Sequence, residues 1–379
     1  MAVFGPEIVF DSDLLQAVYE PHGSKLLLIT FAPFRFKLAP LDFWGKKFAS
    51  NAKISILGFV AKTENWYPQS AMKAAIHASL PRIARYREVV TYGSSMGAYA
   101  ALKYGAALNA GTAVAFAPQY SIDPDDGIQG SEFTMFFRRE LHLGMRISPG
   151  DAPFNSFIFY DSALRFDDLS AKAIQQSNSG VKLIGLPSTG HECIRMFAST
   201  ALTSNLLHLC VKRDEVEVRR LVRQVRSTST VRMAGLARRL VSRDLDGAME
   251  LVHRGAGAFA DRELGNFLND ASVAYLRRGD VNHARNIAMR AHALIPSRAT
   301  YMRTLAAIEL VAQRPGESLR WAEKALKQLP NDVGAMIAAA RASIALQDRA
   351  AALRWTVAAR GLAPNEGRLP AIMAQIESL

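Results

Sequence analysis

Short runs of apolar residues recur through the first half of the chain and alternate with segments of helical apolar spacing. The runs, which are typical of parallel strands buried on both faces, cover residues 25–30, 53–60, 89–92, 111–117, 156–161 and 181–186. Helical spacing appears between them, most clearly over 69–86. This alternation predicts a doubly wound, mostly parallel sheet within residues 1–208.

Beyond residue 208 the pattern becomes helical and rich in alanine. We expect a connecting helix over 209–228 and a helical-repeat domain over 229–379. Prolines recur every 34 residues, at Pro296, Pro330 and Pro364. Small residues lie five and twelve positions before these prolines, at Ala291, Ala325, Ala359, Ala284, Ser318 and Ala352. This part of the chain resembles a tetratricopeptide array of three copies, with a degenerate copy at about 231–261. Such an array offers a groove for a peptide or protein partner, or packs on the sheet domain.

Composition limits the class of protein. The chain has 379 residues, 49% of them hydrophobic, and no apolar run reaches the length of about 18 residues that suggests a membrane span. The N-terminus lacks the layout of a secretion signal, and the two cysteines have no metal-ligand spacing. We therefore expect a cytoplasmic protein that needs no metal and no organic cofactor.

The net charge of +12 raises the question of nucleic acid. The excess arginines lie at helical intervals from Arg219 to Arg298, mixed with acidic residues and without interleaved aromatic residues. This distribution favours solvated helix faces over nucleic-acid binding. An acidic partner or a membrane surface is the alternative.

The candidate chemistry centres on residues 89–102. A buried strand leads into Gly93, Ser95 and Gly97, the G-x-S-x-G spacing of a nucleophile elbow. Small residues must flank the serine because strand and helix backbones almost touch at this turn. The helix N-terminus also directs N–H groups at the site, which favours a developing oxyanion.

A candidate acid and then a candidate general base follow the serine, which is the chain order of catalytic residues in enzymes with this type of elbow. His191 lies in a glycine-containing loop after the last predicted strand. A neutral imidazole there could take the proton of Ser95, and a buried carboxylate could fix its tautomer. Asp161, at the end of a strand, is the preferred acid, and Asp167 is the alternative.

The loop after the first predicted strand is the place for a second oxyanion donor. Counting from the strand end favours the Ala32 N–H, with Phe31 next, whereas Pro33 has no N–H. The segment 121–153 has no clear strand. It is either a lid over the site or a solvent-exposed loop.

Residues 1 to about 208 resemble the α/β-hydrolase domain of a poorly characterised bacterial family. The shared motifs are Trp44-Gly45, the aromatic loop 65–67, the elbow 92–97 and Gly190-His191. The resemblance implies Ser95 as nucleophile, His191 as base and the Met96 N–H as an oxyanion donor.

The expected activity is that of a serine hydrolase or esterase. The substrate would be a small-molecule or carrier-bound acyl ester, and the acyl group would pass to water or to another acceptor. The repeats would bind a protein or the substrate carrier. The alternative is a non-catalytic interaction protein in which a degenerate hydrolase domain serves as a scaffold beside the repeats.

Overall fold

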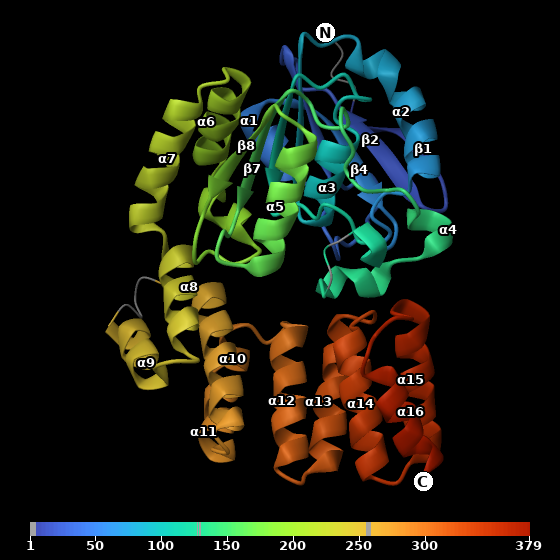
Figure 1. The fold of residues 1–379 in the computed structure, drawn as a ribbon, viewed down its shortest axis with the longest axis vertical. Coiled ribbons are helices and arrows are strands. Elements are labelled where there is room, and N and C mark those ends of the chain that lie inside the picture. The colour runs from blue at the N-terminus through green and yellow to red at the C-terminus, as the bar shows by residue number, and fades with distance from the viewer. Residues whose placement is uncertain (1–4, 127, 129, 255–258) are drawn as a thin grey trace. The chain divides into compact units, whose positions relative to one another are not determined.

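The computed structural model describes residues 5–126, 128, 130–254 and 259–379, and it divides the chain into two compact units. The first unit is Met1–Arg232 and the second is Met233–Leu379. The first contains a sheet, and every regular element described in the second is a helix (Figure 1). The connecting helix expected over 209–228 falls within the first unit.

The first unit is built on an eight-stranded sheet with the spatial order β1-β2-β4-β3-β5-β6-β7-β8. The strands are β1 (Glu7–Asp11), β2 (Leu15–Glu20), β3 (Leu26–Phe31), β4 (Ser55–Ala61), β5 (Glu88–Ser94), β6 (Thr112–Phe116), β7 (Asn155–Tyr160) and β8 (Val181–Gly185). Strand β2 is antiparallel to its neighbours β1 and β4, and every other pairing is parallel. The six predicted strands are confirmed as β3 to β8, whereas the antiparallel strands β1 and β2 were not predicted.

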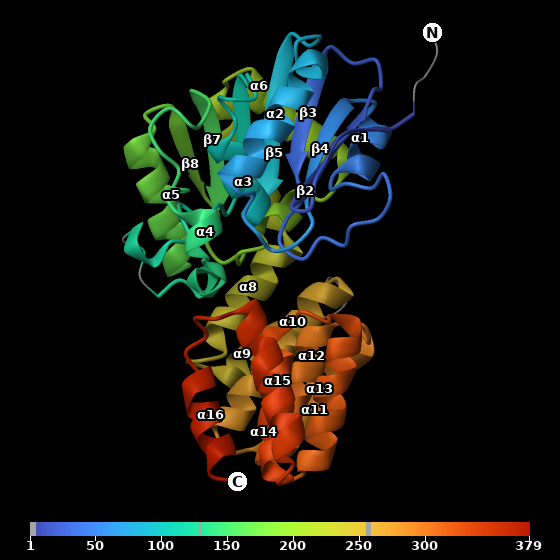
Figure 2. The same ribbon diagram turned by 90° about the vertical axis from the view of Figure 1, so that its right-hand side faces the viewer.

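Alternate residues of the strands enter two separate cores, one on each face of the sheet. On β6, Ala113 and Ala115 face one core, and Val114 and Phe116 face the other. The first core includes residues of α2 (Gln69–Ile83), α3 (Met96–Lys103) and α5 (Arg165–Ser177), and Figure 2 shows α2 and α3 over this face. The second includes residues of α1 (Lys46–Ala52), α6 (Thr200–Val211) and α7 (Glu215–Thr228). Both faces are therefore covered, as continuous apolar strands require.

The predicted connecting helix is two helices, α6 and α7, rather than one. Arg213 has a positive φ of 60°, which a helix cannot continue through. The Asp214 side chain accepts a hydrogen bond of 3.0 Å from the Glu217 N–H and caps α7. Val218 and Val222 of α7 are buried in the core of the first unit, so this helix is part of the sheet domain.

The described residues of the segment between β6 and β7 contain three short helical elements: η1 (Pro124–Asp126), η2 (Glu132–Phe136) and α4 (Arg139–His142). Described residues of this segment are anchored to two side chains of the elbow helix α3, because the Tyr99 hydroxyl donates to the Met145 carbonyl at 2.5 Å and Lys103 makes two further bonds. The Lys103 ammonium donates to the Arg146 carbonyl at 2.7 Å and to the Asp151 carboxylate at 2.8 Å. Since Lys103 is buried, these bonds hold the segment against the sheet domain. The segment is therefore not a loop that extends into solvent.

The second unit is a tetratricopeptide-like array of helix pairs. Its helices are α8 (Thr230–Leu240), which begins in the first unit, α9 (Leu245–Arg254), α10 (Asp261–Arg277), α11 (Val281–Leu294), α12 (Ala299–Val311), α13 (Pro315–Gln328), α14 (Val333–Ala345), α15 (Arg349–Leu362) and α16 (Leu369–Glu377). The starts of α11, α13 and α15 are 34 residues apart. Helices α8 and α9 cover the degenerate copy expected at 231–261, of which residues 255–258 lie outside the described ones.

The predicted small-residue positions all lie where helices touch. Each of the six side chains is fully buried: Ala284, Ala291, Ser318, Ala325, Ala352 and Ala359. The three repeating prolines each follow the end of a helix by two residues. Small side chains thus allow close helix packing, and each proline lies just beyond the helix it cannot continue.

Candidate active site

Ser95 lies at the turn between β5 and α3 in a strained backbone conformation. Its φ is 54° and its ψ is −123°, a region that L-residues rarely adopt. The Ser95 N–H donates to the Phe116 carbonyl of β6 at 2.8 Å, which holds the turn to the sheet. The residue is 9% exposed, so it is almost completely enclosed by its neighbours.

The two flanking glycines are required by close backbone contacts. A Cβ on Gly93 would lie 2.2 Å from the Gly97 carbonyl oxygen, and a Cβ on Gly97 would lie 2.3 Å from the Phe31 carbonyl oxygen. Neither contact can be relieved by rotating a side chain, because both obstacles are backbone. The G-x-S-x-G spacing therefore has the steric basis expected of a nucleophile elbow.

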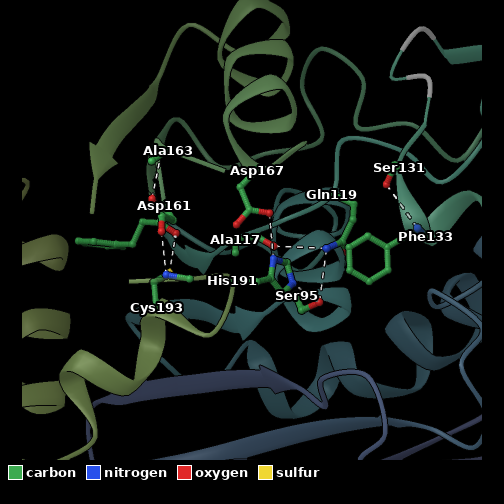
Figure 3. Close-up of polar contacts among 12 residues, drawn as sticks. Ser95, Ala117, Gln119, Ser131, Phe133, Asp161, Ala163, Asp167, His191 and Cys193 are labelled. Atoms are coloured by element: carbon green, nitrogen blue, oxygen red, sulfur yellow. Dashed lines mark hydrogen bonds and ion pairs between the residues drawn. The ribbon is translucent and has the colours of Figure 1, made fainter. Parts of the chain in front are cut away.

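His191, in the loop after β8, faces Ser95 across the carboxyl edge of the sheet (Figure 3). Its Nε2 lies 2.9 Å from the Ser95 Oγ, and its Nδ1 lies 2.9 Å from an oxygen of Asp167. A carboxylate can only accept, so Nδ1 carries the proton and Nε2 presents a lone pair to the Ser95 hydroxyl. The three side chains form a continuous hydrogen-bonded chain from carboxylate to hydroxyl.

The carboxylate on His191 belongs to Asp167 and not to Asp161, the acid that the sequence favoured. Helix α5 begins at Arg165, and Asp167 projects from its first turn. Figure 3 shows Asp161 turned away from the imidazole. Of the two candidate acids, the alternative, Asp167, is therefore the one whose carboxylate lies on the imidazole.

Asp161 instead holds the loop that carries the histidine. Its carboxylate accepts hydrogen bonds from the N–H groups of Ala163 at 2.9 Å, Ser188 at 3.0 Å and Gly190 at 2.7 Å. Gly190 directly precedes His191, and Ser188 lies three residues before it in the same loop. A strand-end aspartate thus serves as an anchor for the loop.

The environment of the imidazole favours proton uptake. Burial lowers the pKa of His191, but the hydrogen bond and charge of Asp167, with smaller contributions from Glu132 and Glu192, outweigh it. The net pKa of His191 is raised above its ordinary value. A base of raised pKa at hydrogen-bond distance from a serine hydroxyl can accept its proton during nucleophilic attack.

The two predicted oxyanion donors differ in their surroundings. Met96 is the first residue of α3, so its N–H has no partner within the helix. The Ala32 N–H donates to the Phe59 carbonyl at 2.9 Å, which extends the pairing of β3 with β4. The Ala32 carbonyl accepts from the Tyr67 hydroxyl at 2.8 Å. Ala32 is thus held on both sides, and its N–H is not free to bind an oxyanion.

Gln119 lies at the site although the sequence analysis did not select it. Its Nε2 is 3.4 Å from the Ser95 Oγ and 3.4 Å from the Ala117 carbonyl. Its Oε1 accepts from the Trp66 indole N–H at 3.1 Å. The available signal was a polar residue just beyond β6, at the edge where the parallel strands end.

Aromatic side chains from three loops surround Gln119 and the catalytic candidates. The Trp66 ring packs against Phe34, Phe133 and Phe136, with centroid distances between 5.5 and 5.9 Å. The Phe133 ring also lies 5.5 Å from the His191 ring. Since Phe133 and Phe136 belong to η2, the segment between β6 and β7 contributes directly to the walls of the site.

A buried histidine fastens this segment to the loop that carries Trp66. The His142 Nδ1 accepts from the Arg138 N–H at 2.8 Å, and its Nε2 lies 3.0 Å from the Asn65 carbonyl. Burial lowers the pKa of His142, which favours the neutral ring that this pair of bonds requires.

Two further properties concern ligands and membranes. Among the described residues, no three His, Cys, Asp or Glu side chains are grouped so that they could hold a metal ion. Within the same ranges, no helix combines the length and apolar character needed to cross a membrane.

Comparison with known proteins gives no family assignment. No known family matches the chain, and no curated protein matches it in sequence. Among solved structures, the tetratricopeptide domain of Arabidopsis OM64 is 19% identical, with a TM-score of 0.30, over 31% of this chain and 98% of that one.

Two bacterial structures are similar over longer stretches. PilF of Pseudomonas aeruginosa is 14% identical, with a TM-score of 0.35, over 46% of this chain and 81% of that one. The capsule O-acetyltransferase of Neisseria meningitidis serogroup A is 14% identical, with a TM-score of 0.36, over 55% of this chain and 93% of that one. At these scores the similarities carry no argument about the site.

Proposed function

We propose that the first unit is a serine hydrolase or acyltransferase of the α/β-hydrolase type. The observation that carries the proposal is the hydrogen-bonded chain of Ser95, His191 and Asp167 on a strained strand-to-helix turn. The chain order of these residues and the steric demand for Gly93 and Gly97 support the same reading. Asp161 anchors the loop of the base and takes no part in the triad.

The proposed reaction has two halves. The Ser95 Oγ attacks the carbonyl carbon of an ester while its proton passes to the His191 Nε2, and the carbonyl oxygen becomes an oxyanion. The Met96 N–H donates to that oxyanion. Collapse of the tetrahedral intermediate breaks the ester bond, and His191 returns the proton to the departing alcohol. Water or an acceptor alcohol then attacks the acyl-enzyme by the same sequence of steps.

The second unit takes a binding role in this proposal. Helical-repeat arrays present extended surfaces to peptides or proteins. We assign the repeats to a protein partner or to the carrier of the acyl substrate, and we place the chemistry in the first unit. This division follows from the chain, because each of the proposed catalytic residues precedes α6.

Labelling with a fluorophosphonate probe tests the proposal. Wild-type protein should be labelled at Ser95 and should hydrolyse p-nitrophenyl acetate, and Ser95→Ala should lose both properties while keeping its thermal unfolding midpoint. Ser94→Ala is the matched control and should retain labelling, because residue 94 ends strand β5 and precedes the apex of the turn.

Two results would contradict the proposal. Labelling of Ser95→Ala at the rate of wild type would refute the assignment of the nucleophile. Wild-type protein that is folded but neither labelled nor active would favour the alternative function, an interaction protein with a degenerate hydrolase scaffold.

A further inference from the structure

We infer that Gln119 is a catalytic residue whose Nε2–H donates to the oxyanion, beside the Met96 N–H. The inference rests on the proposed function and adds a donor that the sequence did not identify. A tetrahedral intermediate needs preorganised donors in a site shielded from water. The Ala32 N–H, which the sequence favoured as the second donor, is already bonded to the Phe59 carbonyl.

The orientation of the Gln119 amide is fixed by its partner. The Trp66 indole N–H can only donate, so the end of the amide that it contacts at 3.1 Å must be the oxygen. The amide nitrogen consequently faces Ser95. Both residues are buried, with Gln119 4% exposed and Trp66 fully enclosed, which holds the amide in place before the reaction begins.

The donor capacity of this nitrogen is poorly used in the resting site. Its two contacts, to the Ser95 Oγ and the Ala117 carbonyl, are both 3.4 Å long. Ordinary N–H···O bonds are about 2.9–3.0 Å long, so these stabilise the resting state little. A donor that is weakly satisfied in the ground state can strengthen its bond as negative charge develops, and only such a gain accelerates the reaction.

The nitrogen is near enough to Ser95 to reach the charge that forms during the reaction. In the tetrahedral intermediate the oxyanion and the Ser95 Oγ are bonded to the same carbon. The charged oxygen then lies within about 2.5 Å of Oγ, which is close enough for a donor 3.4 Å from Oγ to reach it. No proton is transferred by Gln119 in this step; its N–H stays intact, and only the hydrogen bond shortens.

The test compares Gln119→Glu and Gln119→Ala with wild type in p-nitrophenyl acetate hydrolysis. Glutamate keeps an oxygen that can accept from the Trp66 indole, but its carboxylate offers no donor to the site. We expect kcat to fall by about 10²-fold in both variants, the typical effect of removing one oxyanion donor, with KM little changed. Affinity for a trifluoromethyl ketone, which forms an oxyanion on Ser95, should fall by the same factor as kcat/KM.

The control is Gln16→Ala, which removes a buried glutamine of β2 whose Nε2 also makes a 3.4 Å contact, to Asp11. This variant should keep wild-type kcat. Thermal unfolding of each variant identifies any loss of fold, and Gln119→Ala serves if the glutamate variant is unstable.

Two results would overturn the inference. In one, a folded Gln119 variant keeps kcat within about threefold of wild type. In the other, kcat falls while affinity for the ketone is unchanged, which would make Gln119 a positioning residue for the serine hydroxyl. Wild-type protein without Ser95-dependent turnover would refute the proposed function itself, and this inference with it.

Discussion

Replacing Asp167 by asparagine should separate the acid of the triad from the loop anchor Asp161. The substitution preserves size but removes the charge and leaves an amide beside the His191 Nδ1. The amide can present its N–H₂ group there, which favours the tautomer with the proton on Nε2. In that tautomer Nε2 carries a proton and cannot accept the one from Ser95. The two 2.9 Å hydrogen bonds of wild type then no longer lead from the hydroxyl to the carboxylate.

The magnitude follows from the role of the carboxylate. Loss of a tautomer-fixing acid lowers kcat by about 10⁴-fold in a serine triad. At about 1.4 kcal/mol for each tenfold change, this is about 5 kcal/mol of transition-state stabilisation. Asp161→Asn should instead lower the free energy of unfolding by about 2 kcal/mol, because one of three backbone donors loses its acceptor. Its effect on kcat should be much smaller.

The pH dependence provides a second measurement. Activity requires neutral His191, so kcat/KM falls as pH decreases through the pKa of the imidazole. In wild type this limb should lie above the ordinary histidine value, because Asp167 raises the pKa more than burial lowers it. In Asp167→Asn burial remains without the charge, and the limb should move to lower pH.

The assay is the full pH profile of p-nitrophenyl acetate hydrolysis for wild type and both variants. Thermal unfolding of the same samples separates chemistry from stability. The reasoning would be refuted by the reverse ranking, with Asp161→Asn nearly inactive and Asp167→Asn active. It would also be refuted by an acid limb that does not move in Asp167→Asn.

Other predictions test the elbow and the two units. Gly97→Ala should lower the free energy of unfolding by about 3 kcal/mol, since its Cβ would meet the Phe31 carbonyl at 2.3 Å; unchanged denaturant unfolding would contradict the contact. A chain ending at Arg232 should be folded and active on p-nitrophenyl acetate, whereas one ending at residue 209 should aggregate because it lacks the core residues of α7; equal solubility of the two would argue against that packing. Ala325→Leu should destabilise the repeat unit by about 2 kcal/mol and leave ester hydrolysis unchanged, and a parallel loss of activity would count against the division of labour.

Hydrophobic periodicity determined most of the fold. Strands β3 to β7 are almost wholly buried, so their mainly apolar runs are readable from the sequence, whereas the edge strand β8 is half-buried and its run is interrupted by Lys182. The 34-residue spacing of prolines and small residues identified the repeats in the same way, because every copy faces an identical steric demand. Strands β1 and β2 were not predicted, because polar residues at the ends of β1 and at Gln16 of β2 leave this antiparallel hairpin without a long apolar run.

The sequence also identified Ser95 and His191 as candidates, because local geometry imposes their signals. An elbow needs glycines at fixed positions around its serine, and the resulting motif is short and contiguous. The histidine follows the last strand of a parallel sheet, so its loop lies at the same edge as the elbow.

Only the tertiary structure decided which acid reaches the imidazole and which donors face Ser95. Asp161 and Asp167 are six residues apart, and their roles depend on where α5 begins and which way each side chain turns. Ala32 was a reasonable donor by counting, yet its N–H is taken by a neighbouring strand that the count could not include. Gln119 is oriented by Trp66, 53 residues earlier in the chain. Such contacts join residues distant in sequence through directional hydrogen bonds, and a linear pattern of apolar and polar positions contains no record of direction.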